Sequence, residues 1–117
     1  MSQIPIEENI RSITYAQDKV GIVTDNVEGG DPYKLRIYDR EGSPVFEKTF
    51  NYQYTGFDID GDLVLLYNDS SCKVYNMTGT EKYNGTFDFT VSKVSAGRFP
   101  GTLLVMGPQK MTEIKLQ

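Results

Sequence analysis

Three aspartates at alternate positions form the most suggestive cluster of ionisable side chains. Asp58, Asp60 and Asp62 lie in the run DIDGD, and calcium loops of the EF-hand type begin with the same spacing because the cation prefers oxygen ligands. Such a loop also needs glycine at its sixth position and glutamate at its twelfth, where this chain has Leu63 and Asp69. We therefore interpret DIDGD as a hairpin turn with solvated carboxylates, and we expect no bound metal.

Cys72 is the only cysteine, and the sequence contains no histidine. A cysteine reacts as its thiolate, which needs a nearby base or cation to lower the pKa of the thiol. Without histidine the chain lacks the usual partner of a nucleophilic serine or cysteine and the commonest zinc ligand. We expect Cys72 to be a small buried apolar residue, and we expect the chain to be neither an enzyme nor a cofactor-binding protein.

The 8 tyrosines and 6 phenylalanines are the remaining candidates for contact with a ligand. Exposed aromatic faces bind sugars and the side chains of partner proteins. Tyr38 and Tyr75 occupy equivalent positions of an internal repeat, which favours a packing role for both. Tyr52 and Tyr54 lie in the link between two repeats, so we predict that they are the contacts with a ligand or partner.

Three Asn-x-Ser/Thr triplets begin at Asn68, Asn76 and Asn84. In a secreted eukaryotic protein such triplets accept glycans. All three fall at or near predicted turns, where asparagine is favoured because its side chain bonds to the nearby backbone. We interpret them as turn residues.

An internal repeat organises the chain. Residues 35–50 (LRIYDREGSPVFEKTF) align with residues 72–87 (CKVYNMTGTEKYNGTF) at a constant spacing of 37. Chemically similar residues lie between the identical ones, which indicates a true duplication. The identical pairs are Tyr38 and Tyr75, Gly42 and Gly79, Thr49 and Thr86, and Phe50 and Phe87.

The sequence pattern of each repeat predicts four short strands. In the second unit we expect strands at 54–59, 63–67 and 72–75 and a fourth that ends near residue 87, with a hairpin turn at Asp60-Gly61. The stretch 63–67 is continuously apolar, which is typical of a strand covered on both faces. In the first unit the polar, glycine-containing stretch 26–32 predicts an exposed loop.

Four-stranded units of about 40 residues are typical of β-propeller blades. We therefore predict an all-β, antiparallel, propeller-like fold in a single β-repeat domain, residues 1–117, with units at about 10–50, 54–87 and 88–117. The third unit ends early, so the chain has two full units and a partial third. Residues 2–6 could supply the missing strand. Because propellers typically have 4 to 8 blades, we expect the chain to be part of a larger ring or to self-associate through open blade faces.

Composition narrows the classes of partner. The net charge is −4, and the 12 lysines and arginines are scattered, whereas a nucleic-acid binder usually has a basic stripe. The apolar runs have strand length, and a membrane span needs roughly 20 apolar residues. The first ten residues lack the basic and apolar segments of a signal peptide. We expect no contact with nucleic acid or with a membrane.

The chain resembles a family of uncharacterised propeller-like proteins of Gram-positive bacteria. The runs that carry the resemblance are YKLRIYDREGSPVFEKTF (33–50), DLVLLYNDSSCKVYNMTGTEKYNGTF (62–87) and MTEIKLQ (111–117). The resemblance implies that this chain matches the C-terminal blades of an extracytoplasmic propeller, and that a membrane anchor precedes the propeller in the full-length protein. It implies no catalytic residues.

These observations predict a non-catalytic interaction or scaffold module that binds a protein partner or a second copy of itself. Two alternatives stay open, because propellers host many unrelated functions. One is part of an enzymatic propeller, such as a quinoprotein-like dehydrogenase or a lyase, whose site is built from several blades. The other is a glycan-binding module, which requires exposed aromatic side chains.

Overall fold

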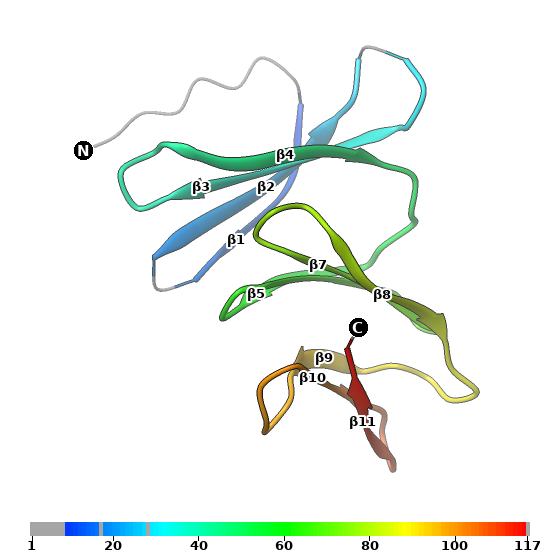
Figure 1. The fold of residues 1–117 in the computed structure, drawn as a ribbon. Coiled ribbons are helices and arrows are strands. Elements are labelled where there is room, and N and C mark those ends of the chain that lie inside the picture. The colour runs from blue at the N-terminus through cyan, green and yellow to red at the C-terminus, as the bar shows by residue number, and fades with distance from the viewer. Residues whose placement is uncertain (1–8, 17, 28, 117) are drawn as a thin grey trace. The chain divides into compact units, whose positions relative to one another are not determined.

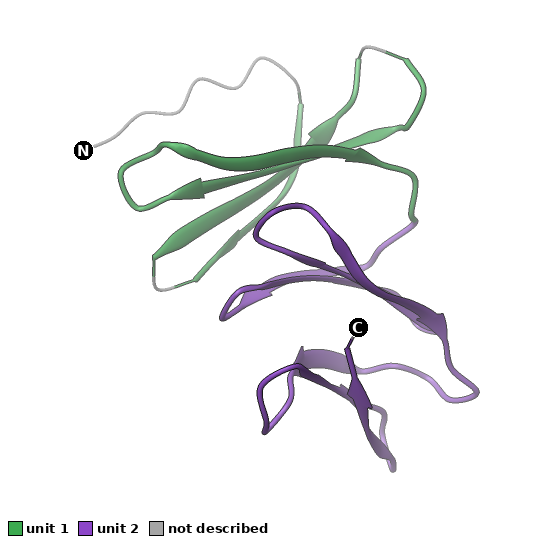
Figure 2. Cartoon of the chain, viewed as in Figure 1, with its two compact units in different colours: residues 1–52 green, residues 53–117 purple. Residues whose placement is uncertain are grey.

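A computed structural model describes residues 9–16, 18–27 and 29–116, which form eleven strands and no helix (Figure 1). Two compact units divide the chain, Met1–Tyr52 and Gln53–Gln117 (Figure 2). The strands are β1 (Ile10–Tyr15), β2 (Lys19–Asp25), β3 (Tyr33–Asp39), β4 (Pro44–Phe50), β5 (Gly56–Asp60), β6 (Leu63–Tyr67), β7 (Ser71–Asn76), β8 (Glu81–Thr86), β9 (Lys93–Ala96), β10 (Thr102–Met106) and β11 (Met111–Lys115).

The first unit is one antiparallel sheet in the order β1-β2-β3-β4. Its two inner strands completely bury Val23, Leu35 and Ile37. β-Branched side chains such as valine and isoleucine are favoured in strands. The predicted exposed loop follows β2. Its bend is held by Asn26, whose Nδ2 donates to the carbonyl oxygens of Gly29 at 3.1 Å and of Asp31 at 2.7 Å.

The second unit contains the sheet β5-β6-β7-β8. β6 is buried along nearly its whole length, as its continuous apolar sequence predicts. The hairpin between β5 and β6 lies one residue later than the sequence predicts, because Asp60 pairs with Leu63 and leaves Gly61 and Asp62 as the loop. Gly61 has a φ of 62°, which only glycine adopts readily, at the first loop position.

A three-stranded sheet in the order β11-β10-β9 completes the second unit. One hydrogen bond joins this sheet to the hairpin of β5 and β6: the backbone N–H of Ala96 donates to Asp60 Oδ2 at 2.9 Å. The carboxylate of Asp60 therefore has a structural role, although the sequence placed it in a solvated turn.

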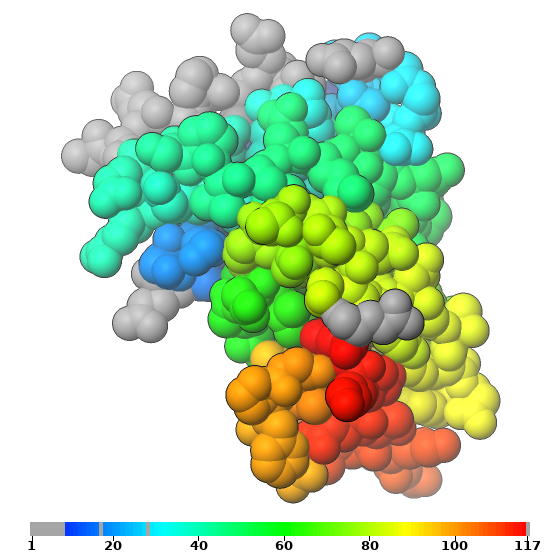
Figure 3. All heavy atoms as spheres, in the orientation of Figure 1, coloured from blue at the N-terminus to red at the C-terminus, as the bar shows by residue number. Residues whose placement is uncertain are grey.

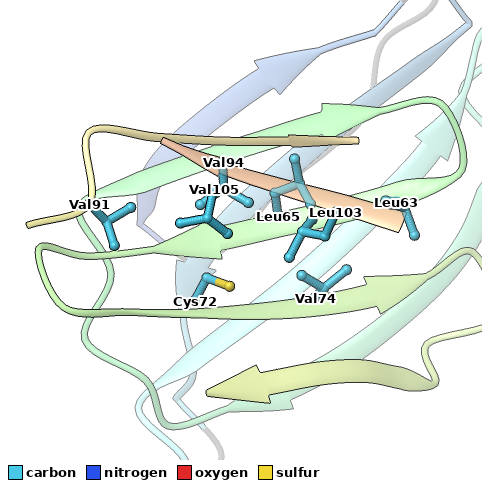
Figure 4. Packing of buried hydrophobic residues seen from close by; sticks show 8 residues of the cluster. All are labelled: Leu63, Leu65, Cys72, Val74, Val91, Val94, Leu103 and Val105. Atoms are coloured by element: carbon cyan, nitrogen blue, oxygen red, sulfur yellow. The ribbon is translucent and has the colours of Figure 1, made fainter. Parts of the chain in front are cut away.

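One hydrophobic cluster holds these two sheets of the second unit together (Figure 4). Side chains from both sheets point into it and are at most 8% exposed. Partly buried aromatic and aliphatic side chains pack around its margin. The buried members are Leu63, Leu65, Cys72, Val74, Val91, Val94, Leu103 and Val105.

The repeat has the same turn in both copies. Asp39 Oδ1 accepts the N–H of Ser43 at 2.9 Å, and Asn76 Oδ1 accepts the N–H of Thr80 at 2.9 Å. Each turn also contains a glycine with positive φ, 86° at Gly42 and 82° at the equivalent glycine of the second copy. The interpretation of Asn76 as a turn residue is confirmed.

The other two Asn-x-Ser/Thr triplets differ from each other. Asn68 is a turn residue, since its Oδ1 accepts the N–H of Ser70 at 3.0 Å and the hydroxyl of Ser71 at 2.9 Å. Asn84 lies inside β8, within the predicted fourth strand, and pairs with Lys73, so its interpretation as a turn residue is wrong. The pairing with β7 continues to Thr86 and carries the strand past this residue.

The fold class is as predicted: all-β, antiparallel and propeller-like, with two four-stranded sheets and a third of three strands. The sheets span residues 10–50, 56–86 and 93–115. The grouping of these units in one domain of a larger propeller stays a prediction. Residues 2–6, suggested above as a missing strand, lie outside the described residues.

Candidate interaction surface

The two tyrosines predicted as contacts belong to different units. Tyr52 ends the first unit and Tyr54 lies near the start of the second, and both are half-buried. Tyr54 lines a hollow of about 310 Å³ with Gln53, Thr55 and residues 68–70. The ring of Phe57 meets the Tyr54 ring edge-on at 6.4 Å. The Nδ2 of Asn68, another residue of this hollow, donates to the carbonyl of Gln53 at 2.7 Å, so that amide is engaged in the fold.

Cys72 is completely buried in the hydrophobic cluster of the second unit, as the sequence predicts. Burial raises the pKa of its thiol to about 12. The folded protein therefore keeps the thiol protonated at neutral pH, in contrast to the lowered pKa that a reactive cysteine requires.

We expect Cys72 to react with a thiol reagent such as DTNB at pH 8 roughly a hundredfold or more slower in the native protein than in urea. The raised pKa and the burial both remove accessible thiolate. Since the folded pKa is above the unfolded one, the free energy of unfolding also falls as the pH rises from about 9 towards 12. Absorbance at 412 nm measures the reaction, and equal rates in both states would contradict the assignment.

The three aspartates of the DIDGD run serve the hairpin. Asp58 Oδ1 accepts the N–H of Ile59 at 2.9 Å, and Asp60 is bonded to Ala96 as described above. Asp62 is exposed in the two-residue loop. Within the described residues, no group of three or more acidic, cysteine or histidine side chains is placed to hold a metal ion.

The outer side of β11 is an edge of the three-stranded sheet in the second unit. In the two four-stranded sheets the third strands, β3 and β7, pair on both sides. β11 is the third strand of the last sheet, and among the described residues it pairs with β10 alone. We call its outer side the open edge. Figure 3 shows atoms of this strand, coloured red, at the molecular surface.

Two hydrogen bonds define which residues direct their backbone towards the open edge. The N–H of Leu116 donates to the carbonyl of Gly101 at 2.8 Å, and the N–H of Gly107 donates to the carbonyl of Lys110 at 2.7 Å. Even-numbered residues of the strand therefore turn their N–H and C=O towards β10. The odd-numbered residues, Met111, Glu113 and Lys115, direct theirs outward.

The side chains of β11 alternate between two environments. Ile114 pairs with Leu103 and, with Leu116, packs against the hydrophobic cluster. Met111, Glu113 and Lys115 lie on the other face and are exposed, Met111 by 62%. The open edge thus has an apolar face towards the core and a mainly charged face away from it.

Aromatic side chains continue the apolar face across the second unit. The rings of Tyr83 and Phe87 stack at 6.3 Å, and those of Phe87 and Phe89 meet at 5.5 Å. All three are partly buried against the same cluster as Ile114. Desolvation by burial raises the pKa of the Tyr83 hydroxyl. These rings, one from β8 and two from the segment that follows it, form a partly buried apolar layer around the cluster.

The charges of the open edge are arranged along one face. Arg98 lies beside Glu113, with 3.4 Å between its Nε and the Oε2 of Glu113. The guanidinium is largely exposed, and an exposed pair of this kind contributes little stability. Lys115 follows two residues after Glu113, so a carboxylate and an ammonium occupy successive positions on the same face.

The sequence predicts an incomplete third unit, and the last sheet has three strands. The contacts predicted at Tyr52 and Tyr54 stay a prediction. The open edge, with Met111, Glu113 and Lys115, is a second candidate that the sequence did not single out. The signal of β11 in the sequence is the alternation of polar and apolar residues in MTEIKL.

The described residues contain no helix that is long and apolar enough to cross a membrane. No curated protein matches the sequence. One similar solved structure is entitled "Crystal structure of HIRA(644-1017)", with a TM-score of 0.63 and 12% identity, covering 93% of this chain and 35% of that one. This chain thus spans about a third of that structure, and the likeness concerns the fold.

A second solved structure is entitled "Crystal structure of the computationally designed Ika4 protein". It has a TM-score of 0.44 and 8% identity, and the match covers 99% of this chain and 96% of that one. The family model that matches the sequence covers residues 1–116. The chain belongs to this family, which is described as a family of unknown function (DUF5711).

Proposed function

We propose that the chain is a non-catalytic, propeller-type interaction module that binds an extended segment of a protein along the open edge. The observation that carries the proposal is that β11 pairs on one side only within the described part of the chain, in contrast to the two-sided pairing of β3 and β7. A free strand edge is a template for another strand, because its N–H and C=O groups have no partners.

The open edge supplies both affinity and selectivity for such a segment. An added strand bonds to the outward backbone groups of Met111, Glu113 and Lys115. Its alternate side chains lie on the same face as Ile114 and enlarge the hydrophobic cluster. The segment should therefore alternate apolar and polar residues.

The chemistry of the buried and acidic groups supports a non-catalytic role. The Cys72 thiol stays protonated, and the carboxylates of Asp58 and Asp60 bond to the backbone of the fold. The net charge of −4 favours a protein partner over nucleic acid or an anionic membrane. The resemblance of the runs quoted above supports a native place outside the cytoplasm, in a protein anchored to the membrane elsewhere.

A short peptide that alternates valine with threonine or lysine tests the proposal. Two versions carry N-methyl groups, either on the valine amides or on the polar residues' amides. The segment is taken to pair antiparallel with β11. When its valines then face the core, their N–H groups point away from β11 and those of the polar residues point towards it. The peptide methylated on its valine amides should therefore still bind, and the peptide methylated on the amides of its polar residues should not.

Amide chemical shifts of the full chain measure the binding. We expect the unmethylated peptide to shift the signals of Met111, Glu113 and Lys115. Shifts confined to the hollow beside Tyr54, shifts in other regions only, or no shifts at all would refute the proposal. Equal binding of the two methylated peptides would refute it as well.

A further inference from the structure

We infer that the open edge is self-complementary and binds the same edge of a second copy of the chain. This inference rests on the proposed function and names one partner for it. In the pairing we infer, the two copies of β11 run antiparallel about a two-fold axis at Ile114. The two three-stranded sheets then form one continuous sheet.

The backbone of β11 permits this register. With the axis at Ile114, Glu113 of one copy lies opposite Lys115 of the other, and the reverse. Both residues direct their N–H and C=O groups outward, so each such pair exchanges both backbone hydrogen bonds. Between these two pairs, Ile114 of one copy lies opposite Ile114 of the other, at a pair where the strands approach most closely.

The side chains agree with the same register on both faces. On the core face Ile114 meets Ile114, and Thr112 meets Leu116 of the other copy, beside the partly buried layer that contains Tyr83. On the outer face each Glu113 meets a Lys115 of opposite charge. Arg98 lies beside Glu113 in each copy, with 70% of its own side chain and 27% of the Glu113 side chain exposed, so Lys115 of the other copy would approach a carboxylate that already accepts from this guanidinium.

Neighbouring registers are less favourable. An axis at Glu113 places the two copies of this carboxylate opposite each other, which is destabilising. An axis at Thr112 moves Ile114 opposite Lys110 and breaks the apolar contact on the core face. Charged residues on an edge strand usually prevent pairing, but the order Glu-Ile-Lys makes them attract in one register.

Charge exchange tests the inference in the full chain. Glu113→Lys leaves only lysines at the two outer positions, and Lys115→Glu leaves only glutamates. For each variant alone, the dissociation constant of the dimer should be at least roughly tenfold higher than that of the original chain, since two attractive pairs become repulsive. Lys93→Glu, which makes the same charge change on β9 at the other edge of the sheet, should dissociate like the original chain.

Complementation provides the sharper result. An equimolar mixture of Glu113→Lys and Lys115→Glu restores opposite charges in both pairs, and so does the double variant Glu113→Lys/Lys115→Glu. Sedimentation equilibrium at low ionic strength should give a dimer for both. Circular dichroism checks that every variant is folded.

Three results would overturn the inference: a monomer at all concentrations of the original chain, a dimer unaffected by the single changes, or a mixture of the single variants that stays monomeric. None of them bears on the peptide experiment. Binding of the alternating peptide at β11 by a monomeric chain would leave the proposed function intact and refute self-pairing alone.

Discussion

Replacing Leu103 with alanine is expected to lower the free energy of unfolding of the second unit by about 2–5 kcal/mol. Leu103 is fully buried in β10 and belongs to the hydrophobic cluster that joins the three-stranded sheet to β5–β8. Its removal takes apolar area from the core and leaves a cavity between the two sheets. Urea titration, followed by the amide signals of the second unit, measures the loss.

Leu104→Ala is the matched control, because Leu104 is the next residue of β10 and points to the opposite face. It is only half-buried, so the same truncation should cost at most roughly half as much. Equal losses for the two variants would mean that the cluster does not hold the sheets together as described.

Gly56→Ala should destabilise the second unit by about 1–3 kcal/mol, although alanine is a small residue. Gly56 pairs with Tyr67, whose ring lies over the glycine. A Cβ at this position would overlap the ring, so the ring must leave its place against the hydrophobic cluster. Urea titration of the single variant measures the cost.

A double-mutant cycle with Tyr67→Leu isolates this clash. In the Tyr67→Leu background the ring is absent, so Gly56→Ala should cost less than in the original chain. The same cost in both backgrounds would place the effect in the backbone of β5 and contradict the packing of Tyr67 on Gly56.

Much of the fold follows from local patterns in the sequence. The duplication places Cys72 at the position of Leu35, and both are fully buried. Tyr38 and Tyr75, equivalent in the repeat, are both buried as well. These agreements arise because strand alternation and repeat position directly determine which side of a sheet a residue occupies.

The errors arose where pairing between strands decides the structure. The turn lies at Gly61-Asp62, one residue later than predicted, because Asp60 extends β5 and pairs with Leu63. Asn84 lies in a strand because β7 and β8 pair through Thr86. Local turn propensity carries no information on such registers.

The candidate surface could be predicted only in part. The alternation in MTEIKL predicts the strand β11, but the direction of each of its N–H groups depends on the pairing of Leu103 with Ile114. Tyr52 and Tyr54 stay predicted contacts, since they lie in the link between two repeats and are half-buried. Aromatic composition alone does not distinguish a packing contact from a binding contact.

Amide hydrogen exchange along β11, measured by NMR at low and at high protein concentration, tests the open edge most directly. In dilute solution we predict fast exchange at Met111, Glu113 and Lys115, and slow exchange at Ile114 and Leu116, whose N–H groups face β10. At high concentration, Glu113 and Lys115 should become protected. Protection of these two amides in dilute solution, or their continued fast exchange in a dimer, would contradict the account.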